Sequence, residues 1–227
     1  MTWAQDNYLE LKTRIEQLAY TYGRLPGEIS LIAVTKTYPV EAILSVYEVG
    51  CHNFGENRVQ EALKKQPLTP QDIQWHLIGS LQLNKVSKVI GKFALVHSVD
   101  SFEVARKISE TSLKLGKKTS VLLQVNTSGE LTKQGWTIES CRNGYEQLLS
   151  LSGICVEGLM TIAPFSQDEY IVRTCFKKLR KLKEQLVVSG GYPLSHLSMG
   201  MSNDFEWAIA EGATLLRIGT AIFGKRE

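Results

Sequence analysis

The chain has 227 residues, of which 43% are hydrophobic and 22% are charged, and it carries a formal net charge of +3. This composition is that of an ordinary globular protein, and so small a charge does not by itself indicate nucleic-acid binding. No apolar run approaches the roughly 18 residues of a membrane span, and no basic segment followed by an apolar core opens the chain. The four cysteines are scattered without a Cys-x-x-Cys pair, which favours reduced thiols in a cytoplasmic protein over a disulfide framework or a metal centre.

An amphipathic helix is predicted over residues 3–22, because apolar side chains recur there at spacings of three and four. Beyond it, short apolar runs alternate with amphipathic segments. The predicted strands are 31–37, 51–54, 73–78, 93–99, 119–125, 154–160, 195–198 and 213–218. The predicted helices between them are 39–49, 58–65, 82–90, 101–115, 137–149, 168–188 and 203–211, and the polar segment 126–135 is the longest predicted loop.

Turn and cap residues punctuate this alternation. Pro39 is expected in the first turn of its helix, and Gly50 is expected just past the end of that helix. Asp100, with Glu103 three residues later, is expected to cap the helix at 101–115. Gly91 and Gly116 are expected to end the helices that precede them.

Eight strands alternating with helices predict a single closed (β/α)8 barrel, or TIM barrel, over about 30–224 within one domain of residues 1–227. Only nine residues follow Ile218, so the helix after the last strand should be nearly absent, with the helix at 3–22 covering the gap. No appended β domain is expected. An open doubly wound sheet is the alternative architecture.

Lys36 lies where the first buried strand passes into a helix, at the carboxyl end of the strand. Both α/β barrels and open α/β sheets keep their chemistry at this end. A lysine there can extend its charged end to solvent along an apolar stem. Alternatively, a partly desolvated amine can form a Schiff base with a carbonyl ligand. The other residues at this end of the barrel decide between the two interpretations.

Two segments, after the seventh and eighth predicted strands, combine hydroxyls with glycine. The first contains Ser198 and Ser202, and the second contains Gly219 and Thr220. Phosphate sites of such barrels usually lie after these two strands, where glycine lets backbone amides approach an anion. The alternative for each segment alone is a helix cap. Together they predict a phosphate-binding site.

Arg217 ends a buried strand, so its charge needs a partner, either a carboxylate such as Asp204 or Glu206 or a ligand. His76 lies in a strand, and both a core position and a ligand contact are open for it. The basic run at 177–183 favours a solvated helix face over RNA or an acidic partner. The remaining histidines are interpreted as structural: His52, His97 and His196.

The same stretches resemble the YggS/PROSC/PipY family of pyridoxal phosphate homeostasis proteins. The matching segments, spread from residue 31 to 224, are Ala33-Val34-Thr35-Lys36, Phe54-Gly55-Glu56-Asn57 with Val59-Gln60-Glu61, Trp75-His76-Leu77-Ile78-Gly79 with Leu81-Gln82-Leu83-Asn84-Lys85, Gly158-Leu159-Met160-Thr161, Leu197-Ser198-Met199-Gly200-Met201-Ser202 with Asp204, and Leu216-Arg217-Ile218-Gly219-Thr220-Ala221-Ile222-Phe223-Gly224.

The resemblance implies a barrel like the N-terminal domain of alanine racemase, called fold type III. It implies that pyridoxal 5'-phosphate (PLP) is held on Lys36 as a Schiff base, with Arg217 facing the pyridine nitrogen. It further implies a phosphate cradle and a ring pocket. The cradle would use Ser198 or Ser202, with Gly219 and Thr220, and the ring pocket would use Asn57, His76 and Met199.

Two functions of different classes follow. The first is a PLP carrier in vitamin B6 homeostasis and amino and keto acid balance, without robust catalysis, catalytic residues or a metal. This protein would be a cytoplasmic monomer that serves apo-forms of PLP enzymes and binds neither membrane nor specific nucleic acid. The second is a PLP-dependent amino-acid racemase, which needs an acid or base on each face of its substrate. Lys36 would supply one face, and the racemases take the other from a partner subunit positioned by the appended domain. A structural or RNA-binding role is the third alternative.

Overall fold

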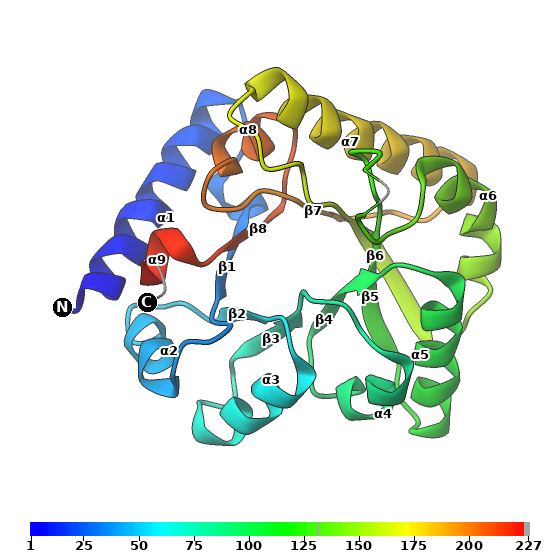
Figure 1. Cartoon of the computed structure of the whole chain (residues 1–227), viewed down its shortest axis with the longest axis horizontal. Coiled ribbons are helices and arrows are strands. Elements are labelled where there is room, and N and C mark those ends of the chain that lie inside the picture. Colours follow the sequence, from blue (N-terminus) through cyan, green and yellow to red (C-terminus); the bar gives the residue numbers. More distant parts are fainter. Residues whose placement is uncertain (131, 225–227) are drawn as a thin grey trace.

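In the computed structural model, which describes residues 1–130 and 132–224, eight parallel strands close into a barrel in chain order (Figure 1). The strands are β1 (Ser30–Val34), β2 (Asn53–Glu56), β3 (Gln74–Leu77), β4 (Leu95–Val99), β5 (Thr119–Gln124), β6 (Ile154–Met160), β7 (His196–Ser198) and β8 (Leu215–Ile218). Because β8 pairs with β1, the sheet has no open edge. The predicted barrel is therefore confirmed, and the open sheet is excluded.

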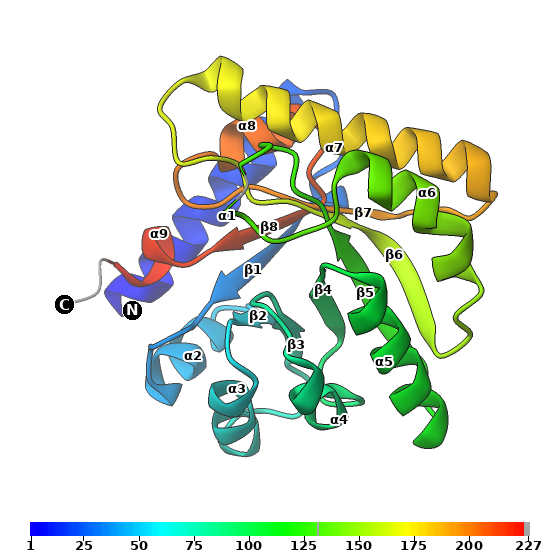
Figure 2. The ribbon, with the colours of Figure 1, turned by 45° about the vertical axis from the view of Figure 1, so that its right-hand side comes forward.

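Helices surround the barrel, as Figures 1 and 2 both show. They are α1 (Trp3–Thr21), α2 (Val40–Tyr47), α3 (Val59–Lys65), α4 (Val86–Val89), α5 (Phe102–Lys114), α6 (Ile138–Leu149), α7 (Glu169–Gly190), α8 (Phe205–Ala210) and α9 (Thr220–Phe223), with 3-10 turns at Pro26–Glu28, Gln66–Leu68 and Leu83–Lys85. None of the helices in this described part of the chain is long and apolar enough to cross a bilayer.

The strands are buried on both faces, as their apolar sequences predict. A small cluster of fully or nearly fully buried side chains fills the barrel interior, and a larger one lies between the barrel and the helices. The inner cluster consists of Ile32, Leu95, Leu122, Met160 and Leu215. Residues two positions apart on a strand face the same side, so this cluster identifies which side chains point inward.

Helix α1 covers the outside of the barrel where β1 pairs with β8, as expected. The Asn7 side-chain amide donates to the Ile222 carbonyl at 3.1 Å, and Arg14 forms an ion pair with Glu206 at 3.0 Å. These contacts join α1 to α9 and α8, which lie beside it in Figure 1. The short α9 thus takes the place of a full eighth helix.

Local structure differs from prediction at several points. The cap of α5 is Ser101 and not Asp100, because the Ser101 hydroxyl accepts from the Val104 amide at 3.3 Å. Pro39 precedes α2 as its N-cap and does not lie in its first turn. Strand β2 begins two residues later than predicted, because the Cys51 amide donates back to the Val46 carbonyl of α2 and pairing with β3 starts only at Asn53.

The helix predicted over 82–90 is only a 3-10 turn followed by the single turn α4. Valine and serine, which fill much of α4, have modest helix propensity. Gly91 then adopts φ +72°, as expected of a residue that ends a helix.

Leu122 tests the importance of the inner cluster. Its replacement by alanine should lower the free energy of unfolding by about 2–5 kcal/mol, because a buried cavity replaces the side chain. Leu113→Ala is the matched control, since Leu113 is 55% exposed and its loss should matter by less than about 0.5 kcal/mol. Urea unfolding followed by circular dichroism measures both, and equal effects would contradict an interior packed in this way.

Candidate functional site

Lys36 lies at the carboxyl end of the barrel, two residues beyond the last residue of β1. Strand β1 is flanked by β2, with Val34 opposite Gly55, and by β8, with Ala33 opposite Ile218. Lys36 therefore lies between the chain just past β2 and the chain just past β8. Ile32 is in the inner cluster, and Lys36 continues the inward spacing of Ile32 and Val34 just past the end of β1.

A buried ion cluster on the outer side of β1 holds the turn that carries Lys36. The Lys65 ammonium from α3 donates to the Thr35 carbonyl at 2.8 Å and to carboxylate oxygens of Glu56 and Glu61 at 2.7 Å each. The Thr35 hydroxyl also donates to Glu56, at 2.8 Å. Burial raises the pKa of Glu56 above its ordinary value, against the opposing effect of Lys65.

Glu61 also reaches the residue after Lys36. Its carboxylate accepts a hydrogen bond from the Thr37 amide at 2.6 Å. Thr37 has φ +70°, which is uncommon for a β-branched residue and costs conformational energy. The hydrogen bond compensates part of this cost and thereby fixes the turn.

Arg217 is only 5% exposed and points into the barrel from β8. Its Nη1 donates to the Ser198 hydroxyl at 2.6 Å, and its Nη2 donates to the Thr161 carbonyl at 2.9 Å. Burial lowers the pKa of the guanidinium to about 10, so Arg217 remains protonated at neutral pH. Of five guanidinium N–H groups, three are left unused by residues 1–130 and 132–224.

The carboxylates expected to neutralise Arg217 have other partners. Glu206 pairs with Arg14, and the Asp204 carboxylate accepts from the Met201 amide at 2.6 Å. Among the described residues Arg217 forms no ion pair, and its hydrogen bonds are with neutral oxygens, although the Asp204 charge raises the pKa of Arg217 against the effect of burial. An arginine held in this way can offer its remaining donors to a ligand.

A chain of hydrogen bonds continues behind Ser198. His97 Nδ1 lies 2.8 Å from the Ser198 hydroxyl, and His97 Nε2 lies 3.0 Å from His76 Nδ1. His76 Nε2 lies 3.2 Å from the Asn53 side-chain oxygen. Burial lowers the pKa of His76 to about 4 and that of His97 well below its ordinary value, so both rings are neutral at pH 7.

The loops after β7 and β8 meet, as the phosphate hypothesis requires. The Ser202 hydroxyl accepts a hydrogen bond from the Ala221 amide at 3.2 Å, which joins the two loops. In the part of the chain that the structure describes, the amides of Ser202, Asn203 and Thr220 donate to no protein acceptor. A side chain at Gly219 would lie 3.1 Å from the Val34 carbonyl, so glycine permits the close approach of β1.

The structure separates other residues that the sequence grouped together. The Ser198 hydroxyl binds Arg217, whereas the Ser202 hydroxyl binds the loop after β8. Met199, which follows Ser198, belongs to the outer core cluster and not to the inner one. Asn57 lies just past β2, and its backbone carbonyl would clash with a side chain at Gly79, so the loops after β2 and β3 touch.

Two features of the site went unrecognised in the sequence. His97 was interpreted as structural, although the alternation from Leu95 places it inside the barrel and β4 pairs with the strand of His76. Lys65 enters the sequence analysis only as the end of the helix predicted over 58–65, although its i,i+4 spacing from Glu61 indicates an ion pair.

The basic run is partly engaged within the protein, since Arg180 pairs with Glu211 at 3.3 Å and Lys178 reaches the Thr127 carbonyl. No group of three or more histidine, cysteine or acidic side chains within 1–130 and 132–224 could hold a metal ion.

The chain forms a closed α/β barrel, and the family model "Alanine racemase, N-terminal domain" matches residues 10–227. A pyridoxal phosphate homeostasis protein from Aquifex aeolicus is 44% identical over 94% of both chains.

Two solved structures are similar throughout. An unknown protein from Bifidobacterium adolescentis has a TM-score of 0.90 and 36% identity, covering 97% of this chain and 94% of that chain. PipY from Synechococcus elongatus PCC7942, solved with PLP bound, has a TM-score of 0.82 and 39% identity, covering 92% and 99%. The chain therefore belongs to the alanine racemase N-terminal domain family and, within it, to the pyridoxal phosphate homeostasis proteins.

The neutral histidines predict a pH dependence of stability. In the unfolded chain a histidine takes up a proton near pH 6.5, whereas native His76 does so only at about pH 4. The unfolded state binds more protons between these values, so the free energy of unfolding should fall as the pH falls from 6.5 towards 4. His76→Gln should reduce this slope by up to about 1.4 kcal/mol per pH unit.

Urea unfolding of the protein without added ligand, repeated at several pH values in this window, measures the slope. His52→Gln is the control, because His52 is exposed and its ion pair with Asp72 lies at the surface. An unchanged slope in His76→Gln would show that native His76 is not held neutral.

Proposed function

We propose that this protein binds PLP at the carboxyl end of its barrel and holds it, attached through Lys36, for delivery in vitamin B6 homeostasis. When bound, PLP supplies an aldehyde that condenses with an amine and a ring that withdraws electrons. The observation that carries the proposal is structural. The turn of Lys36, the donors of Arg217 and the paired loops of Ser202 and Thr220 lie at the same end of neighbouring strands.

Lys36 is proposed to hold PLP through its Nζ, which as the unprotonated amine would condense with the aldehyde and release water. The ion cluster beneath it orders the turn, since Lys65 binds the residue before Lys36 and Glu61 binds the residue after it. Such ordering lets the amine meet the aldehyde without first fixing the backbone. Covalent attachment would hold the cofactor even at an open barrel mouth.

The phosphate is proposed to lie between the two joined loops. The unused amides of Ser202, Asn203 and Thr220 supply donors, and hydrogen bonds to a charged acceptor are the stronger kind. Gly219 keeps the loop close to β1 and therefore close to Lys36. The donor set fits a dianionic phosphate, and Ser198 is assigned to Arg217 instead.

Arg217 is proposed to donate to the pyridine nitrogen through one of its unused N–H groups. Because Arg217 remains protonated at neutral pH, the ring nitrogen would stay unprotonated. An unprotonated ring is a weaker electron sink, which works against racemisation without excluding it, since alanine racemase also has an arginine at this position. Asn57 is proposed to line the ring pocket directly and His76 to act through the chain behind Arg217.

The carrier function is favoured by the exposure of the barrel mouth. Met201 is 37% exposed and Thr220 is also exposed, so water and free amines can reach this end. Solvent access favours exchange of a bound cofactor and disfavours stabilisation of a carbanion. The names of the relatives support the same choice, and the PLP-bound PipY structure supports PLP binding. We further propose that the protein acts in the cytoplasm as a monomer and that apo-forms of PLP enzymes receive the cofactor.

Attachment to Lys36 is tested by chemical trapping. After incubation with PLP and reduction with borohydride, peptide mapping should place the pyridoxyl group on Lys36. Lys36→Ala should retain the fold by circular dichroism and lose the adduct, whereas Lys85→Ala should keep it. An adduct that maps to Lys85 or another lysine would contradict the proposed site.

The carrier function is tested by α-proton exchange of alanine and serine in D₂O with concentrated protein. Exchange should be far slower than an ordinary enzymatic rate, on the order of 1 s⁻¹. The loaded protein should, in contrast, activate an apo-form of a PLP enzyme upon mixing. Exchange near 1 s⁻¹ that Lys36→Ala abolishes would favour the racemase alternative.

A further inference from the structure

We infer that Asn53, His76, His97 and Ser198 are positioning residues that orient Arg217. They form a hydrogen-bonded relay in which each group donates to the next, from Arg217 towards Asn53. The inference deepens the proposed function, on which its cofactor part rests. The relay runs along the inside of the barrel, since Asn53 is the first residue of β2 and Ser198 is the last residue of β7. Its links are all between 2.6 and 3.2 Å long.

The two ends of the relay determine its direction. A guanidinium can only donate, so Ser198 accepts from Arg217. An amide oxygen can only accept, so His76 Nε2 carries a proton and donates to Asn53. In a neutral ring His76 Nδ1 then accepts from His97 Nε2, and His97 Nδ1 accepts the Ser198 hydroxyl proton.

With both histidines neutral and protonated on Nε2, each link has one donor and one acceptor, and the Ser198 hydroxyl proton has an acceptor in His97. A proton added to His97 Nδ1 would make the Ser198 oxygen accept from both sides and leave its hydroxyl proton without this acceptor. It would also place a second positive charge close to Arg217. Burial of both rings, which disfavours their charged forms, acts in the same direction.

The consequence for Arg217 is a defined orientation. The Ser198 hydroxyl, turned by His97, presents a lone pair to Nη1, while the Thr161 carbonyl holds Nη2. Two fixed acceptors define the plane of the guanidinium, so its remaining N–H groups point in set directions. A cofactor ring would meet donors that are already ordered, which lowers the entropic cost of binding.

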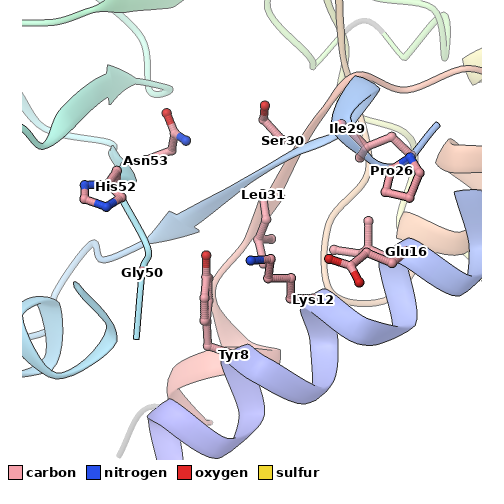
Figure 3. A pocket seen from close by; sticks show the side chains of 12 residues that line it. Tyr8, Lys12, Glu16, Pro26, Ile29, Ser30, Leu31, Gly50, His52 and Asn53 are labelled. Carbon is pink, nitrogen blue, oxygen red and sulfur yellow. The ribbon is translucent and has the colours of Figure 1, made fainter. Parts of the chain in front are cut away.

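The far end of the relay reaches the opposite end of the barrel. Asn53 also lines a hollow of about 280 Å³ between α1 and the start of β1, together with Lys12 and Ser30 (Figure 3). Asn53 is therefore remote from Lys36 along the barrel axis and has no place in a cofactor pocket at the carboxyl end. An effect of Asn53 on cofactor binding has to pass through the relay.

The relay itself is tested without any cofactor. ¹⁵N-labelled histidine in the apo-protein distinguishes protonated from unprotonated ring nitrogens by nuclear magnetic resonance. At neutral pH, His76 and His97 should both show a protonated Nε2 and an unprotonated Nδ1, with assignment by His76→Gln and His97→Gln. Protonation of Nδ1 in either ring would overturn the inferred direction.

The positioning role is tested at Asn53. Asn53→Leu removes the terminal acceptor and should weaken PLP binding, measured by equilibrium dialysis, by about three- to tenfold. It should also change the Nε2 signal of His76. Asn53→Gln keeps a neutral amide oxygen and should restore both, and Asn143→Leu on the exposed face of α6 is the control.

The outcomes separate the two proposals. Parent affinity for PLP in Asn53→Leu would overturn the positioning role. Failure of the parent protein itself to bind PLP would overturn the proposed function and the cofactor part of this inference, while the NMR result would still decide the direction of the relay. If Asn53→Leu does not fold, His97→Gln gives the same test. Its affinity for PLP should be weaker than that of the parent, and an unchanged affinity would overturn the positioning role.

Discussion

A cation buried inside the barrel is the constraint on which the rest of the site depends. Removing the charge of Arg217 from water is costly, and no carboxylate within 1–130 and 132–224 pairs with it. The protein stabilises it with oriented neutral groups, a hydroxyl and a carbonyl, and the Asp204 carboxylate, although it forms no ion pair, also raises the pKa of Arg217 against the effect of burial. Barrels of this kind fill their interior with aliphatic side chains. Here the hydroxyl that binds Arg217 needs polar neighbours, and His97 and His76 supply them inside the barrel.

The fold was predictable because each level of the sequence agrees with the others. The strand at 154–160 was predicted with its observed bounds, and the alternation of strands and helices led directly to the barrel. The errors were local. Asp100 and Ser101 are both good caps, and only backbone geometry decides between them. The limits of β2 depend on its pairing with β3, which a single segment does not reveal.

The site was predictable only in part. Lys36 and Arg217 could be placed at one end of the barrel because strand ends converge there. Their environments depend on the register of the strands. Register places His97 beside His76, and because neighbouring residues of a strand face opposite sides of the sheet, Met199 faces the helices whereas Ser198 faces the barrel interior. Lys65 was missed for a related reason, since its partner Glu56 comes from a different element.

The buried cluster around Lys65 has a consequence for the motions of the protein. One oxygen of Glu56 has no hydrogen-bond partner in the described part of the chain, so α3 is held by a cluster that is not fully satisfied. Groups of this kind lower the stability of the region that contains them. Any local opening of helix α3 would break these contacts. Each such opening would release Thr35 and Thr37 together, and the order of the turn around Lys36 would be lost while the barrel remained intact.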